Sequence, residues 1–145
     1  MKSRKNKKKV YVVFAADILH EGHINILSKA SKYGDVIVGL LSDKAVTSYK
    51  KLPQINYKQR EVVLKNIKFV KSIIPQYEID YTKNLNKIKP DYVFHGDDWK
   101  KGILSGIRSK VIKQLKKWNG KLIEIPYTKN ISSTIIKKRT LETGN

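Results

Sequence analysis

The sequence predicts a single α/β domain with a five-stranded parallel sheet, doubly wound so that helices cover both of its faces. Short runs of β-branched and aromatic residues alternate along the chain with stretches whose apolar residues recur at helical spacing. The β-like runs are almost continuously apolar, which is typical of strands buried on both faces of a sheet. A length of 145 residues corresponds to one domain.

Five segments carry the strand pattern, and each contains residues of high β-propensity. The third is the shortest, because Pro75 follows it directly. The predicted strands cover residues 10–14 (VYVVF), 35–41 (DVIVGLL), 72–74 (SII), 91–95 (DYVFH) and 121–127 (KLIEIPY).

Three longer helices fit between these strands. Each places apolar residues three and four positions apart, so that they share one face. Asn56 is a suitable N-cap for the second helix, and the pair Asn119-Gly120 ends the third. The helices and their apolar faces are residues 22–33 with Ile26, Leu27 and Ala30, residues 57–68 with Val63, Leu64 and Ile67, and residues 103–118 with Ile107, Val111 and Leu115.

This order assigns the domain to residues 10–145 and leaves a basic tail at residues 1–9, which we expect to be flexible. Ligands of open α/β sheets bind beyond the carboxyl ends of the strands, near the point where the strand order reverses. Candidate positions for a site are therefore the segments that follow predicted strands. They are residues 15–23, 42–53, 96–99 and 128–134.

The net charge of +19 comes mostly from Lys, since only four of the 31 basic residues are Arg. A solvated Lys-rich surface explains most of this charge; small polyanionic substrates are the next interpretation, and a basic nucleic-acid-binding module is an alternative. The absence of Cys excludes disulfides, zinc–thiolate sites and Cys nucleophiles. No apolar run approaches the roughly 18 residues that span a bilayer. We expect a cytoplasmic protein that binds neither membranes nor nucleic acids.

The segment AADILHEGH, residues 15–23, contains an HxGH pattern formed by His20, Gly22 and His23. It comes directly after the first predicted strand. Gly22 allows a backbone to approach a ligand closely, and the free amides at a helix start attract anions. Two imidazoles there can donate hydrogen bonds to phosphate oxygens and stabilise the charge that develops on a transferring phosphorus. The pattern predicts a catalytic phosphate site, with surface or metal-binding histidines as the alternative.

Two other segments offer polar groups at strand ends. The segment ISSTIIKKR, residues 131–139, presents Ser132, Ser133 and Thr134 at the start of the last helix. Their hydroxyls and amides suit phosphate oxygens, although Ser and Thr are also ordinary N-caps. The segment HGDDW, residues 95–99, provides two carboxylates and an indole that can contact a substrate, or alternatively a plain turn.

The segment HEGH after VYVVF resembles the signature of the HxGH nucleotidyltransferase superfamily, and of its cytidylyltransferases in particular. The resemblance extends from about Val10 to Arg139 and includes the ISST and GDDW segments. It implies a Rossmann-like fold in which His20 and His23 contact the triphosphate of CTP and stabilise the transition state. It also implies that Asp17 interacts indirectly with Mg²⁺, or another divalent cation, through the CTP phosphates.

The resemblance assigns further residues by their position in its motifs. Arg60 lies in YKQR, which is similar to a YEHR element of the family, and is assigned both to catalysis and to substrate binding. The residues assigned to the nucleotide are Phe14, Ala15, Ala16, Asp17, Gly22, His23, Gly96, Asp97, Ser132, Ser133 and Thr134. Those assigned to the acceptor substrate are Lys50, Lys51, Arg60, Asp98, Trp99 and Tyr127, the last standing where the family commonly has Arg.

Within the family, the sequences of these segments most resemble those of cytidylyltransferase domains associated with phosphoenolpyruvate mutase in phosphonate biosynthesis. This resemblance implies the transfer of CMP from CTP to a small phosphonate such as 2-hydroxyethylphosphonate, with release of pyrophosphate. Glycerol 3-phosphate as the acceptor, giving CDP-glycerol, is an alternative, and ATP in place of CTP is another. The resemblance also implies a homodimer.

Overall fold

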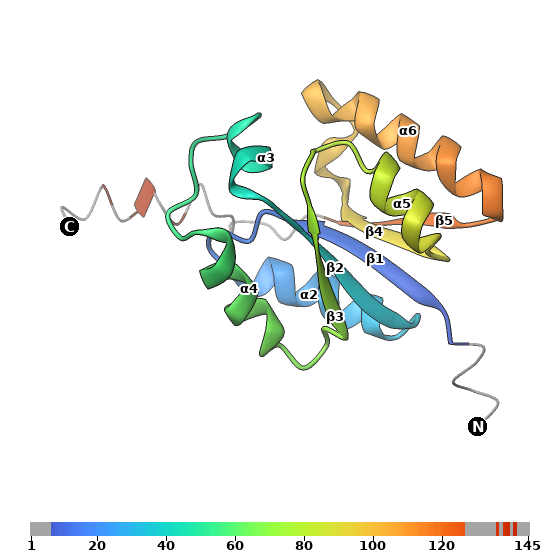
Figure 1. Ribbon diagram of the computed structural model, residues 1–145, viewed down its shortest axis with the longest axis horizontal. Coiled ribbons are helices and arrows are strands. Elements are labelled where there is room, and N and C mark those ends of the chain that lie inside the picture. Colours follow the sequence, from blue (N-terminus) through green and yellow to red (C-terminus); the bar gives the residue numbers. More distant parts are fainter. Residues whose placement is uncertain (1–6, 127–135, 137, 140, 142–145) are drawn as a thin grey trace.

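The computed structural model describes residues 7–126, 136, 138, 139 and 141. Within these residues the chain forms one parallel sheet of five strands in the order β3-β2-β1-β4-β5 (Figure 1). The predicted α/β doubly wound fold is confirmed. The strands are β1 (Lys9–Phe14), β2 (Asp35–Leu41), β3 (Ser72–Gln76), β4 (Tyr92–Gly96) and β5 (Lys121–Ile125).

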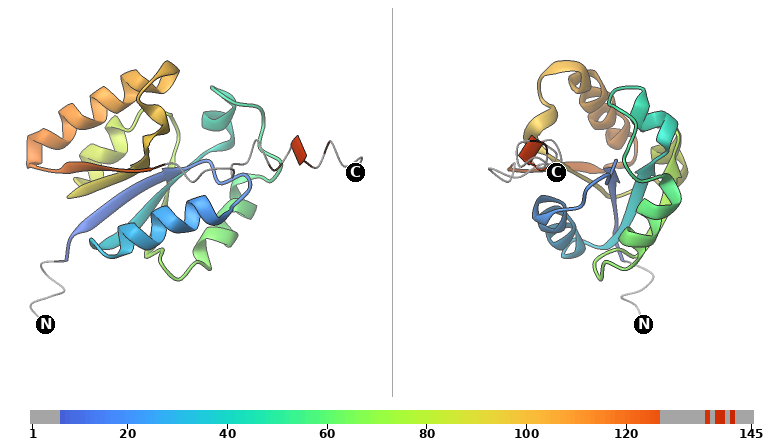
Figure 2. Two further views of the ribbon diagram at one scale, coloured as in Figure 1. Left: turned by 180° about the vertical axis from the view of Figure 1, so that it is seen from behind. Right: turned by 90° about the vertical axis from the view of Figure 1, so that its left-hand side faces the viewer.

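Both faces of the sheet are covered by helices, as Figure 2 shows. Helices α2 (Glu21–Ser31) and α4 (Tyr57–Lys65) cover one face, and α5 (Thr82–Ile88) and α6 (Ser105–Leu115) cover the other. The central strand β1 therefore sends side chains into two cores. Val10, Val12 and Phe14 pack with α2 and α4, while Tyr11 packs with α5 and α6.

The structure contains two short helices that periodicity does not reveal, α3 (Asp43–Thr47) and α5. Each has fewer than eight residues, which is too short for an apolar pattern to repeat. The predicted helix 103–118 divides into α6 and two flanking 3₁₀ turns, Gly102–Leu104 and Lys116–Trp118. Strand β3 continues through Pro75, because β3 is the edge strand and tolerates a residue without an amide donor.

The strand order reverses next to β1. The chain runs from β1 outward to β2 and β3, and then returns to place β4 on the other side of β1. The crevice beyond the carboxyl ends of β1 and β4 is the topological switch point, where open α/β sheets bind their ligands. In the part of the chain that the structure describes, no helix is long and apolar enough to cross a membrane.

Candidate active site

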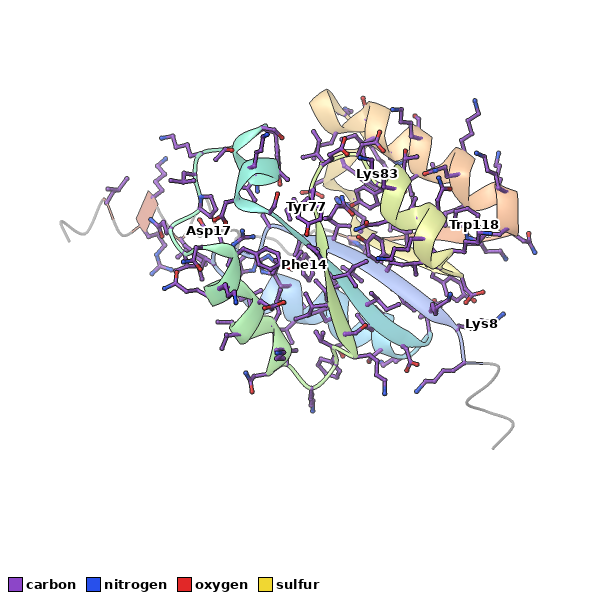
Figure 3. The ribbon with its side chains drawn as sticks, in the orientation of Figure 1. Lys8, Phe14, Asp17, Tyr77, Lys83 and Trp118 are labelled. Atoms are coloured by element: carbon purple, nitrogen blue, oxygen red, sulfur yellow. The ribbon has the colours of Figure 1, made fainter. Side chains whose placement is uncertain are left out.

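A cavity of about 550 Å³ opens at this switch point. It is formed by the end of β1, the loop to α2, the first turn of α2, the end of α3 and the end of β4. Ten residues that the sequence assigned to the site line it together: Phe14, Ala15, Ala16, Asp17, His20, Gly22, His23, Lys50, Gly96 and Asp98. In Figure 3 the labelled Asp17 lies at this end of the molecule and Lys8 lies at the opposite end.

The two histidines of the HxGH motif hold each other in place through the start of α2. His20 is the N-cap of the helix, and its Nδ1 accepts a hydrogen bond from the Gly22 amide at 3.1 Å. The Nδ1 of His23 accepts one from the His20 amide at 3.2 Å. The ring centroids are 4.1 Å apart, and the Phe14 ring packs edge-on against His23. The motif thus forms a reciprocal cap in which the imidazoles replace the usual short polar side chains.

This cap determines which ring nitrogens carry protons. Because Nδ1 is an acceptor in both rings, the proton of each neutral imidazole lies on Nε2. Burial lowers the pKa of His20, and burial together with the charges of His20 and Lys50 lowers the pKa of His23 to about 4. Both histidines are therefore neutral at pH 7, and each has one Nε2–H group to donate to an anion.

The chain makes a tight turn between β1 and the histidines. Ala16 has a φ of 56°, a left-handed conformation that side chains other than Gly adopt at some cost. Directly after it, the Asp17 carboxylate accepts hydrogen bonds from the backbone amides of Gln54 at 2.7 Å and Ile55 at 3.3 Å. The turn therefore brings the end of β1 against the loop that leads into α4.

Arg60 has a different role from the one that the sequence predicted. Its side chain is 0% exposed and does not line the cavity. The guanidinium donates to the carbonyl oxygens of Ala15 at 2.6 Å and Leu41 at 2.8 Å, and to the Asp43 carboxylate at 2.6 Å. The sequence assigned Arg60 to catalysis and substrate binding, whereas in this structure its two terminal nitrogens join the ends of β1 and β2 to the start of α3, and its buried Nε has no hydrogen-bond partner among the described residues.

The end of β4 contributes a histidine that was not among the predicted site residues. His95 lines the cavity, and its ring is stacked on Trp99 with centroids 3.6 Å apart. Trp99 in turn donates from Nε1 to Glu124 at 2.8 Å, and Glu124 accepts two hydrogen bonds from Arg108. His95 Nδ1 lies 2.7 Å from the Gly96 carbonyl oxygen, so its proton is on Nδ1 and its Nε2 is an acceptor. The sequence signal that could have identified His95 as a site residue is its position at the end of a strand, directly before GDDW.

A side cavity of about 60 Å³ lies behind this histidine. It is mostly apolar and aromatic, with Tyr81 and Trp99 among its walls. Five residues line both cavities: Val13, Ala15, Tyr49, His95 and Leu104. Trp99 therefore borders the side cavity and not the main one. Burial raises the pKa of both Tyr49 and Tyr81, and the charge of Asp98 adds to the rise in each case.

The remaining predicted residues fall into two groups. Asp97 and Lys51 are close to the cavity in sequence but do not line it. Tyr127, Ser132, Ser133 and Thr134 lie outside the described residues, although Pro126, which precedes them, lines the cavity.

The described residues do not include a group of three or more His, Asp or Glu side chains arranged to hold a metal ion. One oxygen of Asp17 already accepts two amides, and the Asp98 carboxylate, on the other side, lies 3.7 Å from His95 Nδ1. These residues do not fit a resident metal. Mg²⁺ bound mainly through substrate phosphates needs no such group, because it keeps several of its waters.

The fold and the cavity together define a nucleotidyltransferase. A doubly wound sheet presents paired imidazole donors, a helix start and the Lys50 ammonium at its switch point, which is a set of groups for a polyphosphate. The Cytidylyltransferase-like family model matches residues 15–139. The chain belongs to this family, and it is a CTP-dependent nucleotidyltransferase.

Several relatives match over almost the whole chain, among them the following two. Glycerol-3-phosphate cytidylyltransferase of Bacillus subtilis is 29% identical over 139 residues, covering 90% of this chain and 95% of the relative. FAD synthase of Picrophilus torridus is 30% identical over 146 residues, covering 94% and 99%. Among solved structures, a lipopolysaccharide core biosynthesis protein from Thermoplasma volcanium superposes with a TM-score of 0.70 at 24% identity, over 87% of this chain and 100% of that one. The last similarity establishes the fold alone.

Proposed function

We propose that the protein transfers CMP from CTP to a small phosphonate, such as 2-hydroxyethylphosphonate, and releases pyrophosphate. The observation that carries the proposal is the pair of neutral Nε2–H donors held at the switch point by the reciprocal cap of His20 and His23. The choice of a phosphonate is supported by the resemblance of FAADILHEGHINIL and KPDYVFHGDDWK to the phosphonate-associated branch of the family, although GDDW by itself also resembles glycerol-3-phosphate cytidylyltransferase.

The proposed reaction is a single displacement at phosphorus. A phosphonate oxygen attacks the α-phosphorus of CTP, the bond from that phosphorus to the oxygen bridging to the β-phosphorus breaks, and pyrophosphate leaves with the electron pair. The acceptor oxygen is already anionic, so no general base is needed. The protein instead has to hold two anions in line and stabilise the charge that develops between them.

His20 and His23 provide that stabilisation in the proposal. An Nε2–H donor fixed by a hydrogen bond at Nδ1 does not have to reorganise when charge increases on a nearby phosphoryl oxygen. The amides of the first turn of α2 and the Lys50 ammonium add positive potential on the same side of the cavity. Because both imidazoles are neutral, they act by donating hydrogen bonds, and no proton is transferred to the leaving group.

The carbon end of the acceptor fits the side cavity beside His95. A volume of about 60 Å³ corresponds to a few non-hydrogen atoms, such as a short carbon chain with its terminal polar group. His95 Nε2 is an acceptor there, so it suits a terminal group that donates a hydrogen bond. This orientation places the phosphonate toward His20 and His23.

The proposal also includes Mg²⁺ and a homodimer. Mg²⁺ bound to the phosphates of CTP would reduce their repulsion of the acceptor. The resemblance to the family supports the dimer. Apolar side chains that are partly exposed on the helices of one face, Ile24 at 37% and Val63 at 46%, offer surface for a second copy. Light scattering after gel filtration tests this part of the proposal.

The main alternative keeps CTP and changes the acceptor to glycerol 3-phosphate, as the name of the Bacillus subtilis relative suggests. The FAD synthase relative supports a second alternative, in which another nucleotide is transferred. A third alternative, that the protein is a basic nucleic-acid-binding module without catalytic activity, predicts salt-sensitive binding to nucleic acid and no release of pyrophosphate.

One assay separates these functions. Purified protein is incubated with each of the four nucleoside triphosphates and Mg²⁺ against a panel of acceptors, and pyrophosphate is measured. The panel contains 2-hydroxyethylphosphonate, 2-aminoethylphosphonate, glycerol 3-phosphate and ethanolamine phosphate. The proposal predicts that CTP with a phosphonate gives the highest kcat/KM. A higher value with glycerol 3-phosphate, or with ATP, would replace it.

A further inference from the structure

The loop between α3 and α4 borders the active-site cavity and carries one cation, Lys50, to its lining. The amide of Lys50 donates to the Val46 carbonyl at 2.8 Å, which continues the last turn of α3. The neighbouring Lys51 is exposed, and Leu52 is 68% exposed. After Leu52, the position of the loop depends on the contacts made by its second half.

Asp17 holds that other end. Its Oδ1 accepts the amides of Gln54 and Ile55, which directly precede Asn56, the N-cap of α4. Carboxylate–amide hydrogen bonds of this kind are charge-assisted and stronger than neutral ones. The contact joins residues 37 and 38 positions apart, so it is a tertiary contact and not part of a local turn.

A second contact joins the end of β1 to α4 itself. Arg60 of α4 donates to the Ala15 carbonyl, two residues before Asp17. The turn at Ala16 lies between these two points and is held in its left-handed conformation. The turn before the HxGH motif is therefore held at two points, by the residues that precede α4 and by Arg60 within α4.

We infer that Asp17 is a positioning residue. Its hydrogen bonds to the Gln54 and Ile55 amides, here called the clasp, hold the α3–α4 loop so that the Lys50 ammonium lies against the nucleotide. The inference rests on the proposed function for the identity of the nucleotide. The hydrogen bonds of the clasp, however, are present in the protein without any ligand. It differs from the role that the resemblance implied, in which Asp17 serves the metal-bound triphosphate. A clasp requires an oxygen acceptor at this position, whereas a metal partner requires the negative charge.

Backbone amide exchange measured by NMR on the ligand-free protein tests the clasp directly. Wild type, Asp17→Ala and Asp17→Asn are compared, because Asn keeps an acceptor oxygen and loses the charge. The clasp predicts that the Gln54 and Ile55 amides exchange about tenfold faster or more in Asp17→Ala. In Asp17→Asn they retain most of their protection. Unchanged exchange of these amides in Asp17→Ala would overturn the inference, whatever the enzyme's activity.

A double-mutant cycle then tests the connection to Lys50. If the clasp acts through Lys50, Asp17→Ala raises the KM for CTP in the wild-type background by about tenfold, and has little further effect in Lys50→Ala. In the matched control background Lys58→Ala, an exposed lysine on α4, the full effect remains. If Asp17→Ala raised the KM for CTP by the same factor in the Lys50→Ala background as in wild type, the connection to Lys50 would be contradicted. A higher Mg²⁺ concentration required by Asp17→Asn would also contradict the inference, because it would indicate a metal partner.

Discussion

On the side of the cavity formed by β1, α2 and the end of α3, three donors accompany the Asp17 carboxylate, whereas the side formed by the end of β4 offers acceptors. The first side has the Nε2–H groups of His20 and His23 and the Lys50 ammonium. The second has His95 Nε2 and the Asp98 carboxylate. The difference shows how one cleft can orient an unsymmetrical acceptor, with its anionic end toward the donors and its other end toward the acceptors.

The two sides also obtain their rigidity differently. The donor side is fixed by a left-handed turn and by hydrogen bonds between side chains and backbone: the helix cap, and two contacts with α4 and the residues before it. The acceptor side is fixed by side chains, in the series Arg108, Glu124, Trp99 and His95. Side chains can be exchanged without altering the backbone, so we expect substrate choice to reside on the acceptor side and the phosphoryl chemistry on the donor side.

The largest expected effect is on the donor side. His23→Ala removes one preorganised donor and should lower kcat roughly 10²- to 10⁴-fold, the range observed when one electrostatic stabiliser is lost. Single-turnover release of pyrophosphate, together with circular dichroism to establish folding, measures this. Near-normal turnover in a folded variant would contradict the assignment of this side to the chemistry.

The next effect concerns Arg60, whose hydrogen bonds support the donor side from beneath the cavity lining. Arg60→Ala leaves two carbonyl oxygens and the Asp43 carboxylate without their donor and should lower the free energy of unfolding by about 3 kcal/mol. Urea unfolding measures the change. A stability equal to that of wild type, with a raised KM for the acceptor, would restore Arg60 to substrate binding.

The pH dependence of stability reports on the His23 cap. Its pKa is about 4 in the folded protein and about 6.5 in the unfolded chain, so the unfolded state binds more protons between these values. The free energy of unfolding should therefore fall as the pH drops from 6.5 to 4. His23→Asn keeps an acceptor oxygen without a titrating group, and its stability should fall about 2 kcal/mol less across this window. Parallel curves for the two proteins would contradict a buried neutral His23.

The smallest effect belongs to the acceptor side. Tyr81→Phe removes one hydroxyl from the side cavity and retains the aromatic ring. It should raise the KM for the acceptor about three- to tenfold, the scale of one hydrogen bond, and leave the KM for CTP unchanged. An equal change in both KM values would break the division of the cavity into two sides.

The fold and the donor side could be predicted from the sequence because their signals are local. The strands are unbroken apolar runs, and the HxGH motif sits directly after the first of them. The contacts of Arg60 could not be predicted, since nothing in YKQR shows that two carbonyls and a carboxylate surround it from distant segments. The same holds for Asp17, whose amide partners lie 37 and 38 residues away.

The central claim is that two neutral imidazoles, each with its proton on Nε2, face the nucleotide. Nitrogen-15 NMR of the imidazole rings at pH 7, with the chain labelled at histidine, tests this most directly. The account predicts that His20 and His23 each show an unprotonated Nδ1 and a protonated Nε2, with the Nε2 signals shifting when CTP and Mg²⁺ are added. Doubly protonated rings, or protons on Nδ1, would contradict it.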